Sequence, residues 1–202
     1  MSDTPGLVEL GPGPGTWHLD PMHSSLIFVA RYLAFGRVQG TFGRARGQVQ
    51  VPSDPLQARV DVTLDASSIN TGVAARDHHL RSPDFLDVAT HPELRFVSRR
   101  IARDGTRTGF RLTGDLTIHG VTNEIVLTGR WVGDAPDYLR YGQAHGHFFT
   151  ANSSIRLSDF GVGDGGEVPW GGRLVGDVVD IVLEARLQNQ DPTEVLRELG
   201  HE

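Results

Sequence analysis

Hydrophobic and polar positions alternate with a period of two along most of this chain. The clearest segment is residues 60–66, where four apolar side chains share one face and three polar side chains share the other. The same alternation recurs over residues 26–32, 112–118, 145–157 and 179–187. Strict alternation of this kind predicts antiparallel strands with one buried face and one exposed face.

The strand pattern predicts an all-β fold. We count roughly eight antiparallel strands joined by hairpins, with one short helical insert and no repeating strand-helix-strand pattern. A sandwich and a closed barrel are both compatible with this count. The barrel is favoured, because several strands are long for a sandwich and glycines recur where strands must bend, at Gly36, Gly40, Gly43 and Gly47.

The two ends of the chain differ in composition from the middle. Residues 1–15 are rich in proline and glycine and are expected to form a flexible arm. The barrel domain is predicted over residues 16–190. Residues 191–202 are predicted to form a short tail of weak helical character, beginning at Asp191-Pro192. Exposed strand edges, or the apolar stripe of this tail (Val195, Leu196, Leu199), would serve to form a homodimer.

Composition narrows the class of partner. The formal charge is -6 with both signs interspersed, and no basic stripe is present, so nucleic acid is not an expected partner. The absence of cysteine excludes disulfides, thiolate catalysis and cysteine-ligated metals. No signal-peptide pattern is seen, and no apolar run approaches the ~20 residues of a membrane helix. We therefore expect a cytoplasmic protein without membrane insertion.

The predicted barrel interior mixes large and small side chains. An eight-stranded barrel has room for its own side chains or for one small ligand. Small residues beside large ones, such as Ala30 beside Phe28 and Ala151 beside Phe149, leave space for a guest. Any single aromatic residue could equally be part of a packed core. As a set they predict a lined tunnel, formed by Phe28, Tyr32, Phe35, Phe42, Phe85, Phe96, Phe149 and Phe160.

The segment Arg76-Asp77-His78-His79 concentrates polar chemistry on the helical insert. Arg76 and His79 are three residues apart and share a helix face. In one interpretation, both donate hydrogen bonds to a polar ligand head at the barrel mouth. In the other, Arg76 and Asp77 tie the helix to its neighbours, with Asn70 or Thr71 capping its start. The sequence leaves both open.

Known catalytic and metal-binding patterns are missing from the sequence. His78 and His79 are adjacent and would point to different faces, while His145 and His147 share a strand face without an identifiable third ligand. No Gly-x-Ser-x-Gly motif occurs, and the glycines at 161–166 are not followed by Lys-Ser/Thr. We predict no catalytic residue, no metal and no required cofactor, although a bound isoprenoid or other lipid is compatible with the tunnel.

Motifs spread from Trp17 to Arg186 resemble those of the YceI-like family of polyisoprenoid-binding, lipocalin-like proteins. They include Trp17-x-Leu19-Asp20, His23-Ser24-Ser25, Ser67-Ser68-Ile69-Asn70-Thr71, Arg76-Asp77-x-His79-Leu80, Ser82-x-Asp84-Phe85, His91-Pro92, Gly114-Asp115-Leu116-Thr117-Ile118-His119-Gly120-Val121-Thr122, Ser158-Asp159-Phe160-Gly161 and Val175-Gly176-Asp177.

The resemblance implies an elongated lipocalin-like barrel with a helical cap at one end. It also implies a dry tunnel for a long isoprenoid chain, in some members a quinone or prenyl pyrophosphate, and no established catalytic residue. Two positions depart from the family pattern. Tyr32 replaces a usual histidine, and Arg156-Leu157 replaces a usual Asn-Arg pair, so candidates for holding a polar head are lost at both.

These observations lead to three hypotheses. The first is a non-enzymatic binder of a lipophilic, polyisoprenoid- or quinone-like molecule, with Arg76 and His79 added to the aromatic set at the entrance. The second is an enzyme for a lipophilic substrate that uses Arg76, Asp77 and His79 at the barrel mouth. The third is an interaction module whose barrel is filled by its own side chains.

Overall fold

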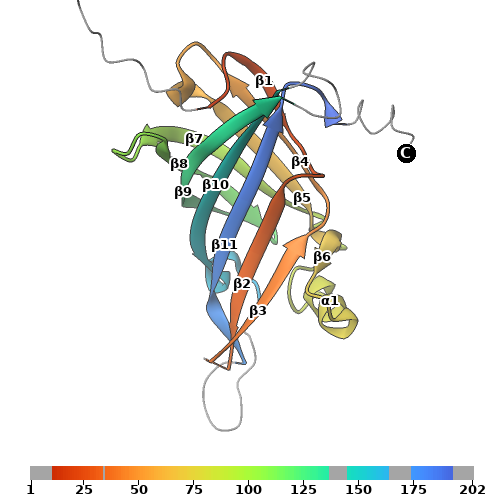
Figure 1. The fold of residues 1–202 in the computed structure, drawn as a ribbon. Coiled ribbons are helices and arrows are strands. Elements are labelled where there is room, and N and C mark those ends of the chain that lie inside the picture. The colour runs from red at the N-terminus through yellow and green to blue at the C-terminus, as the bar shows by residue number, and fades with distance from the viewer. Residues whose placement is uncertain (1–10, 34, 137–144, 164–173, 193–202) are drawn as a thin grey trace, which may run out of the picture.

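The chain folds into one antiparallel sheet that curls into a barrel (Figure 1). The computed structural model describes residues 11–33, 35–136, 145–163 and 174–192. Within these residues the sheet has eleven strands. They are β1 (Gly15–Leu19), β2 (Ser25–Tyr32), β3 (Gly36–Phe42), β4 (Ala45–Val51), β5 (Arg59–Asp65), β6 (Ile69–Asn70), β7 (Glu93–Arg103), β8 (Gly109–Ile118), β9 (Val121–Pro136), β10 (His145–Arg156) and β11 (Val175–Gln188).

Helical structure in the described residues is confined to short segments. The α-helix α1 (Ala74–Arg81) follows β6 and lies beside it (Figure 1). Three 3-10 helices in the same residues join strands, namely η1 (Pro55–Gln57), η2 (Ala66–Ser68) and η4 (Leu157–Phe160). None of the helices in the described part of the chain has the length or the hydropathy needed to span a bilayer.

Eight strands form a closed ring. Their order is β1-β4-β5-β7-β8-β9-β10-β11, and β11 pairs back onto β1. The other three strands, β2, β3 and β6, continue from a different part of the same β11 edge. The predicted all-β, eight-stranded antiparallel barrel with a short helical insert is therefore confirmed, and β2, β3 and β6 extend its wall beyond the ring.

A buried ion pair holds the corner where β1 ends and β2 begins. β11 pairs with β1 at its end and with β2 farther back, and Arg186 lies at the change of partner. Its backbone N–H donates to Ser24 Oγ (3.0 Å), and its carbonyl accepts from the Asp20 N–H (2.9 Å). Its guanidinium donates to the Asp20 carboxylate, and the two side chains are only 7% and 5% exposed. Alternation predicts Arg186 on the exposed face, which is wrong because this corner covers it.

The Asp20 carboxylate is ionised in spite of its burial. Burial opposes the charged form, but hydrogen bonds from His23 and Arg186, together with the N–H of Met22, outweigh it and hold the pKa of Asp20 below its ordinary 3.8. His23 Nδ1 lies 2.8 Å from the carboxylate. The corner is thus a small charged network on the outside of the barrel wall.

The inner face is built by the residues whose alternation predicted it. Apolar side chains of β5, β8 and β11 point inward, while Asp61 of β5 points outward and accepts from Arg95. The inward set includes Val60, Val62, Leu64, Leu112, Leu116, Val179, Ile181, Leu183, Ala185 and Leu187. Period-two patterning therefore gives the correct face for these strands.

Three phenylalanine rings of the inner face lie across glycines of the neighbouring strand. The pairs are Phe28 with Gly40, Phe96 with Gly114, and Phe110 with Gly129. A Cβ added to any of the three glycines would lie less than 3.0 Å from the ring. The missing side chains let the rings rest against the wall instead of crossing the barrel axis.

Several predictions about loops and ends have different outcomes. The polar composition of residues 133–142 predicts a loop, but β9 continues to Pro136, and residues 137–142 lie outside the described residues. Parts of the predicted arm (residues 1–10), of the glycine-rich loop (164–173) and of the C-terminal tail (193–202) lie outside the described residues. The predicted apolar stripe Val195, Leu196 and Leu199 falls in the last of these.

Replacing Asp20 by Asn should destabilise the fold by about 3 kcal/mol at pH 7, because Arg186 stays buried without the carboxylate that faces it. The exposed Asp84→Asn control should change the free energy of unfolding by less than about 0.5 kcal/mol. Urea denaturation measures both. Equal stability of Asp20→Asn and the wild type would contradict the assigned role.

The same pair predicts a pH dependence. Because the pKa of Asp20 is lowered on folding, its stabilisation is present above about 3.8 and is lost as the pH falls through the lower folded pKa. The difference in unfolding free energy between the wild type and Asp20→Asn should shrink as the pH falls below about 4. A difference that stays constant down to pH 3 would show that the charge does not matter.

Gly40→Ala should destabilise the protein by about 1–3 kcal/mol, because the new methyl group displaces the Phe28 ring. In a Phe28→Leu background the same change should cost clearly less, and a double-mutant cycle measures this coupling. Gly43→Ala is the control, since its Cβ would meet nothing closer than 3.7 Å. Additive effects at positions 28 and 40 would contradict the ring-on-glycine contact.

Candidate functional site

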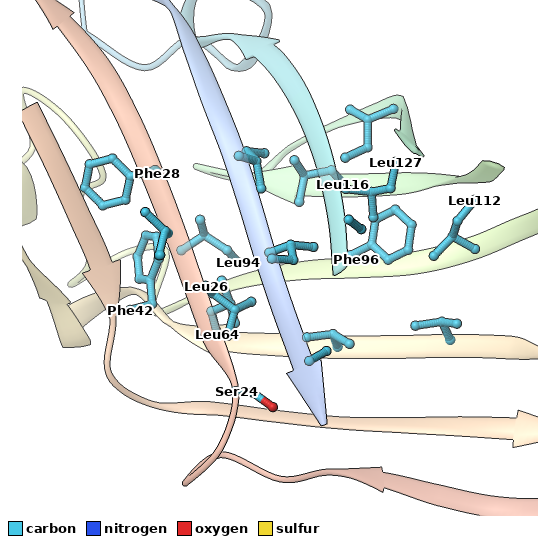
Figure 2. A pocket seen from close by; sticks show the side chains of 18 of the residues that line it. Ser24, Leu26, Phe28, Phe42, Leu64, Leu94, Phe96, Leu112, Leu116 and Leu127 are labelled. Carbon is cyan, nitrogen blue, oxygen red and sulfur yellow. The ribbon is translucent and has the colours of Figure 1, made fainter. Parts of the chain in front are cut away.

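An apolar cavity of about 350 Å³ extends along the inside of the barrel. At one end its wall includes Ile69 and Phe85, and at the other it includes Pro12, Pro55 and Ala58. Figure 2 shows leucine and phenylalanine side chains from several strands converging on this space. Among the described residues that line it, only four are polar, namely Ser24, Ser25, Arg95 and Glu184.

Inward-facing side chains of the barrel remain partly accessible. They lie on the strand faces that would be buried in a filled barrel, yet they are intermediate in exposure because they border the cavity. They include Phe28, Ala30, Phe42, Val60, Leu64, Ile101, Phe110, Ile125, Ala151, Ile181 and Leu183. A filled barrel, the third hypothesis, does not agree with this interior.

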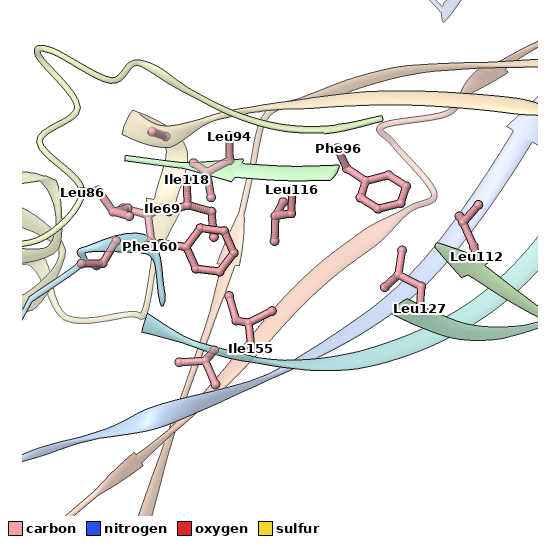
Figure 3. Close-up of a cluster of buried hydrophobic side chains, with 13 residues drawn as sticks. Ile69, Leu86, Leu94, Phe96, Leu112, Leu116, Ile118, Leu127, Ile155 and Phe160 are labelled. Atoms are coloured by element: carbon pink, nitrogen blue, oxygen red, sulfur yellow. The ribbon is translucent and has the colours of Figure 1, made fainter. Parts of the chain in front are cut away.

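The cap end is the tightly packed end. Ile69, Leu86, Ile118 and Phe160 meet there, and Phe160 is only 1% exposed (Figure 3). Leu80 of α1, with Phe85 and Leu86 from the turn after it, contributes to the cavity wall. The helical insert therefore closes one end of the cavity with apolar side chains.

The ten predicted ligand-binding residues divide into two groups. On the cavity wall lie Phe28, Phe42, Phe85, Phe96 and Phe149. Off the wall lie Tyr32, Phe35, Arg76, His79 and Phe160. Ligand contact stays a prediction for all ten. Tyr32, Phe35 and Phe160 do not line the tunnel as expected, and Arg76 and His79, which were expected at its mouth, are not on its wall.

The three aromatic residues of the second group lie off the wall because the strand alternation ends at or before each of them. Tyr32 is the last residue of β2, and Phe35 belongs to the turn into β3, where Leu33 has a left-handed φ of 50°. Their exposed fractions are 43% and 96%. Phe160 ends η4, which turns its ring into the packed core.

Two charged residues of α1, Arg76 and Asp77, form hydrogen bonds to the loop before the helix. Asp77 is buried and accepts from the Thr71 N–H (2.8 Å) and Oγ1 (2.5 Å), while Arg76 donates to Thr71 Oγ1 and to its carbonyl. Arg76 and Asp77 thus tie the helix to the loop before it, as one of the two interpretations predicted. The cap was wrongly predicted, since the N-cap is Val73, without a side-chain hydrogen bond.

Neither the Asp77 carboxylate nor the His79 ring reaches the cavity. Burial opposes ionisation of Asp77, but the Thr71 hydrogen bonds and the nearby Arg81 and Arg76 outweigh it and lower its pKa. His79 is 59% exposed, packs edge-on against Phe85 (5.4 Å between ring centroids) and lies 3.9 Å from Asp84. The enzyme hypothesis placed this cluster at the mouth, and the structure places it outside the wall.

The second histidine pair, His145 and His147, is not part of a group of three metal donors in the described residues. His145 Nε2 lies 2.5 Å from Asp134, which lowers the pKa of that carboxyl group. His147 is buried with its ring edge-on to Trp17. Within the described segments these residues do not form a cluster of three metal donors.

The predicted set of ligand-binding residues left out the aliphatic part of the wall and one aromatic residue. Phe110 lines the cavity, and its alternation with Leu112 on β8 was the signal that could have found it. Ile101 and Val175 also line it, but each lies beside a β-bulge, where the simple alternation shifts.

The barrel wall is thin along one seam. Pairing of β9 with β10 stops at Thr128 and Asn152. Beyond this point Ser153 Oγ donates to the Val126 carbonyl (2.9 Å), and a polar hollow opens on the outside. Three residues line both this hollow and the cavity, namely Ile125, Ile155 and Ile181.

Comparisons with known proteins agree with this geometry. Protein YceI of Escherichia coli O157:H7 is 34% identical over 141 residues, covering 69% of this chain and 71% of that protein. The crystal structure of Burkholderia cenocepacia BcnA has a TM-score of 0.69 at 24% identity and covers 85% of this chain and 99% of its own. A polyisoprenoid binding domain from Saccharophagus degradans, implicated in plant cell wall breakdown, has a TM-score of 0.56 at 15% identity, with coverage of 85% and 97%.

The match extends over almost the whole barrel. The sequence model of the YceI-like domain covers residues 17–187, from the second half of β1 to the penultimate residue of β11. This range contains the closed ring, the cap and every cavity-lining residue except Pro12. The chain belongs to the YceI-like family.

Proposed function

We propose that this protein is a non-enzymatic carrier that binds one lipophilic, polyisoprenoid- or quinone-like molecule inside the barrel. The observation that carries the proposal is the cavity of about 350 Å³ with a nearly continuous apolar wall. Its volume falls within the usual range of ligand pockets. The family, and the structural likeness to a polyisoprenoid binding domain, support the same class of ligand.

Burial of a hydrocarbon chain supplies enough free energy for such a carrier. One isoprene unit removes about five carbons from water, worth up to ~4 kcal/mol at ~0.8 kcal/mol per carbon. Association and ordering of the chain reduce this gain. Even so, a few units reach the roughly 8 kcal/mol of micromolar binding without a polar contact.

The few polar lining residues favour a ligand with a small head or none. Glu184 and Ser25 are paired across β11 and β2, and Ser24 precedes them at the same corner. At the positions that depart from the family pattern, Tyr32 is exposed and the Arg156 side chain is 63% exposed beside Asp177, while Leu157 presents an apolar side chain to the cavity. Because neither Tyr32 nor Arg156 lines the cavity, burial of the ligand's hydrocarbon chain is the main source of affinity.

Two expectations from the sequence accompany the proposal. We infer that the carrier works in the cytoplasm, and that it acts as a homodimer without nucleic acid as a partner. Light scattering of the purified chain tests the homodimer.

A series of prenols of increasing length tests the ligand class. Affinity measured by titration calorimetry should rise at least about tenfold for each added isoprene unit until the cavity is full, because each unit buries more apolar surface. Native mass spectrometry of freshly purified protein should also show a bound lipid. Apo protein alone, with no binding of any prenol, would exclude the proposal.

Filling the cavity from its wall should remove binding without unfolding the barrel. Ala151→Phe places a ring in the cavity and should weaken prenol binding at least about tenfold, with the melting temperature retained. Asn152→Phe, the next residue and exposed, is the matched control and should bind normally. His79→Ala should also bind normally, and its loss of binding would restore the α1 cluster as a ligand site.

A further inference from the structure

A cluster of three potential metal ligands lies outside the cavity. Asp87 and His91 belong to the turn between α1 and β7, and His119 belongs to the turn between β8 and β9. One donor atom from each lies within 4.8 Å of the other two. Across the described ranges, this is the one group of three such residues that could hold a metal ion.

The three side chains have no other polar role. Each is half-buried, and within the part of the chain described by the structure none of them forms a hydrogen bond or an ion pair through its side chain. Asp20 and Asp77, by contrast, each accept several hydrogen bonds. A carboxylate and two imidazoles that face one another, with no side-chain partner of their own, leave all three donor atoms free to bind a cation.

The backbone holds the donors together. Thr90 and His91 N–H groups donate to the Asp87 carbonyl (3.0 and 2.8 Å), which closes a turn with Asp87 and His91 at its two ends. The His91 and His119 rings meet with centroids 4.7 Å apart at 67°. A Cβ on Gly120 would lie 2.7 Å from His91 Cε1, so the ring rests directly on that glycine.

Two of the donors occupy unusual backbone conformations. Asp87 has φ 42° and His119 has φ 52°, both in the left-handed region. His119 and Gly120, at φ 74°, form a two-residue hairpin turn with positive φ at both positions, where Asn usually precedes Gly. Strained residues of this kind cluster at functional sites.

We propose that Asp87, His91 and His119 bind a divalent transition-metal ion of the Zn²⁺ type. Two imidazoles and one carboxylate are ligands that suit Zn²⁺. Three donors no more than 4.8 Å apart would place an ion at most about 2.8 Å from each, against about 2.0–2.1 Å for Zn–N bonds. Side-chain movements of less than about 1 Å complete the site, and a fourth position stays open to water.

The bound ion would join two separate parts of the barrel end. Leu86, directly before Asp87, is on the cavity wall, and Ile118, directly before His119, is in the core beside it. A metal therefore fastens the cap to the β8–β9 hairpin. This inference is independent of which ligand the cavity holds.

The test uses the full chain, stripped with a chelator and titrated with Zn²⁺ alone. Calorimetry should give a site of one ion per chain, and Zn²⁺ at about 100 times its dissociation constant should raise the melting temperature by about 5 °C or more. Co²⁺ as a spectroscopic probe should give the visible absorption of a four-coordinate site with nitrogen ligands.

Two variants identify the ligands. His119→Asn suits the hairpin turn, and Asp87→Asn keeps the side-chain shape, so both should melt at or near the wild-type temperature in chelator while losing the Zn²⁺ shift and the Co²⁺ spectrum. His78→Asn, at an exposed histidine on α1, is the matched control and should keep both. Absence of Zn²⁺ binding in the wild type, or equal binding in all three variants, would overturn the proposal.

Discussion

Strand β11 has to satisfy two partners along one edge, and the barrel depends on how the chain solves this problem. Where β1 leaves the edge and β2 joins it, a gap in the ladder would leave the backbone groups of Arg186 without strand partners. The corner supplies Asp20 N–H and Ser24 Oγ in their place, and the Asp20 carboxylate meets the guanidinium. One buried charged pair thus lets a single sheet be both a closed ring and an extended wall.

The barrel interior, unlike the densely bonded corner, contains unfilled space, and this space reduces apolar packing. Buried apolar contacts at the cap end and around Trp17, Leu19, Val51 and Leu187 at the other end supply the core. Between them the inward side chains border a cavity. A filled interior would bury more apolar surface and be more stable. The ring-on-glycine contacts keep even the bulky side chains against the wall, so the space agrees with a protein built to hold a guest.

Local patterning predicted the faces of the strands but not what happens where strands end or separate distant segments meet. The alternation of residues 60–66 and 179–187 gave the inner wall correctly, except at Arg186, where a corner distant in sequence covers the outer face. The prediction failed for Tyr32 because it is the last residue of β2, and for Phe35 and Phe160 because a turn and a 3-10 helix replace the strand. The grouping of Asp87 and His91 with His119 depends on two turns meeting in space, which no local period records.

The incomplete pairing between β9 and β10 affects how easily the barrel wall opens locally. Beyond Thr128 and Asn152 the two strands are linked by the Ser153 side chain in place of a regular ladder. Segments with fewer backbone hydrogen bonds open at a lower free energy than the rest of a fold. Amide hydrogens near Val126 should therefore exchange earlier than those of the paired strands. The isoleucines Ile125, Ile155 and Ile181 line both the cavity and the outer hollow, so one layer of residues separates the interior from solvent at this seam.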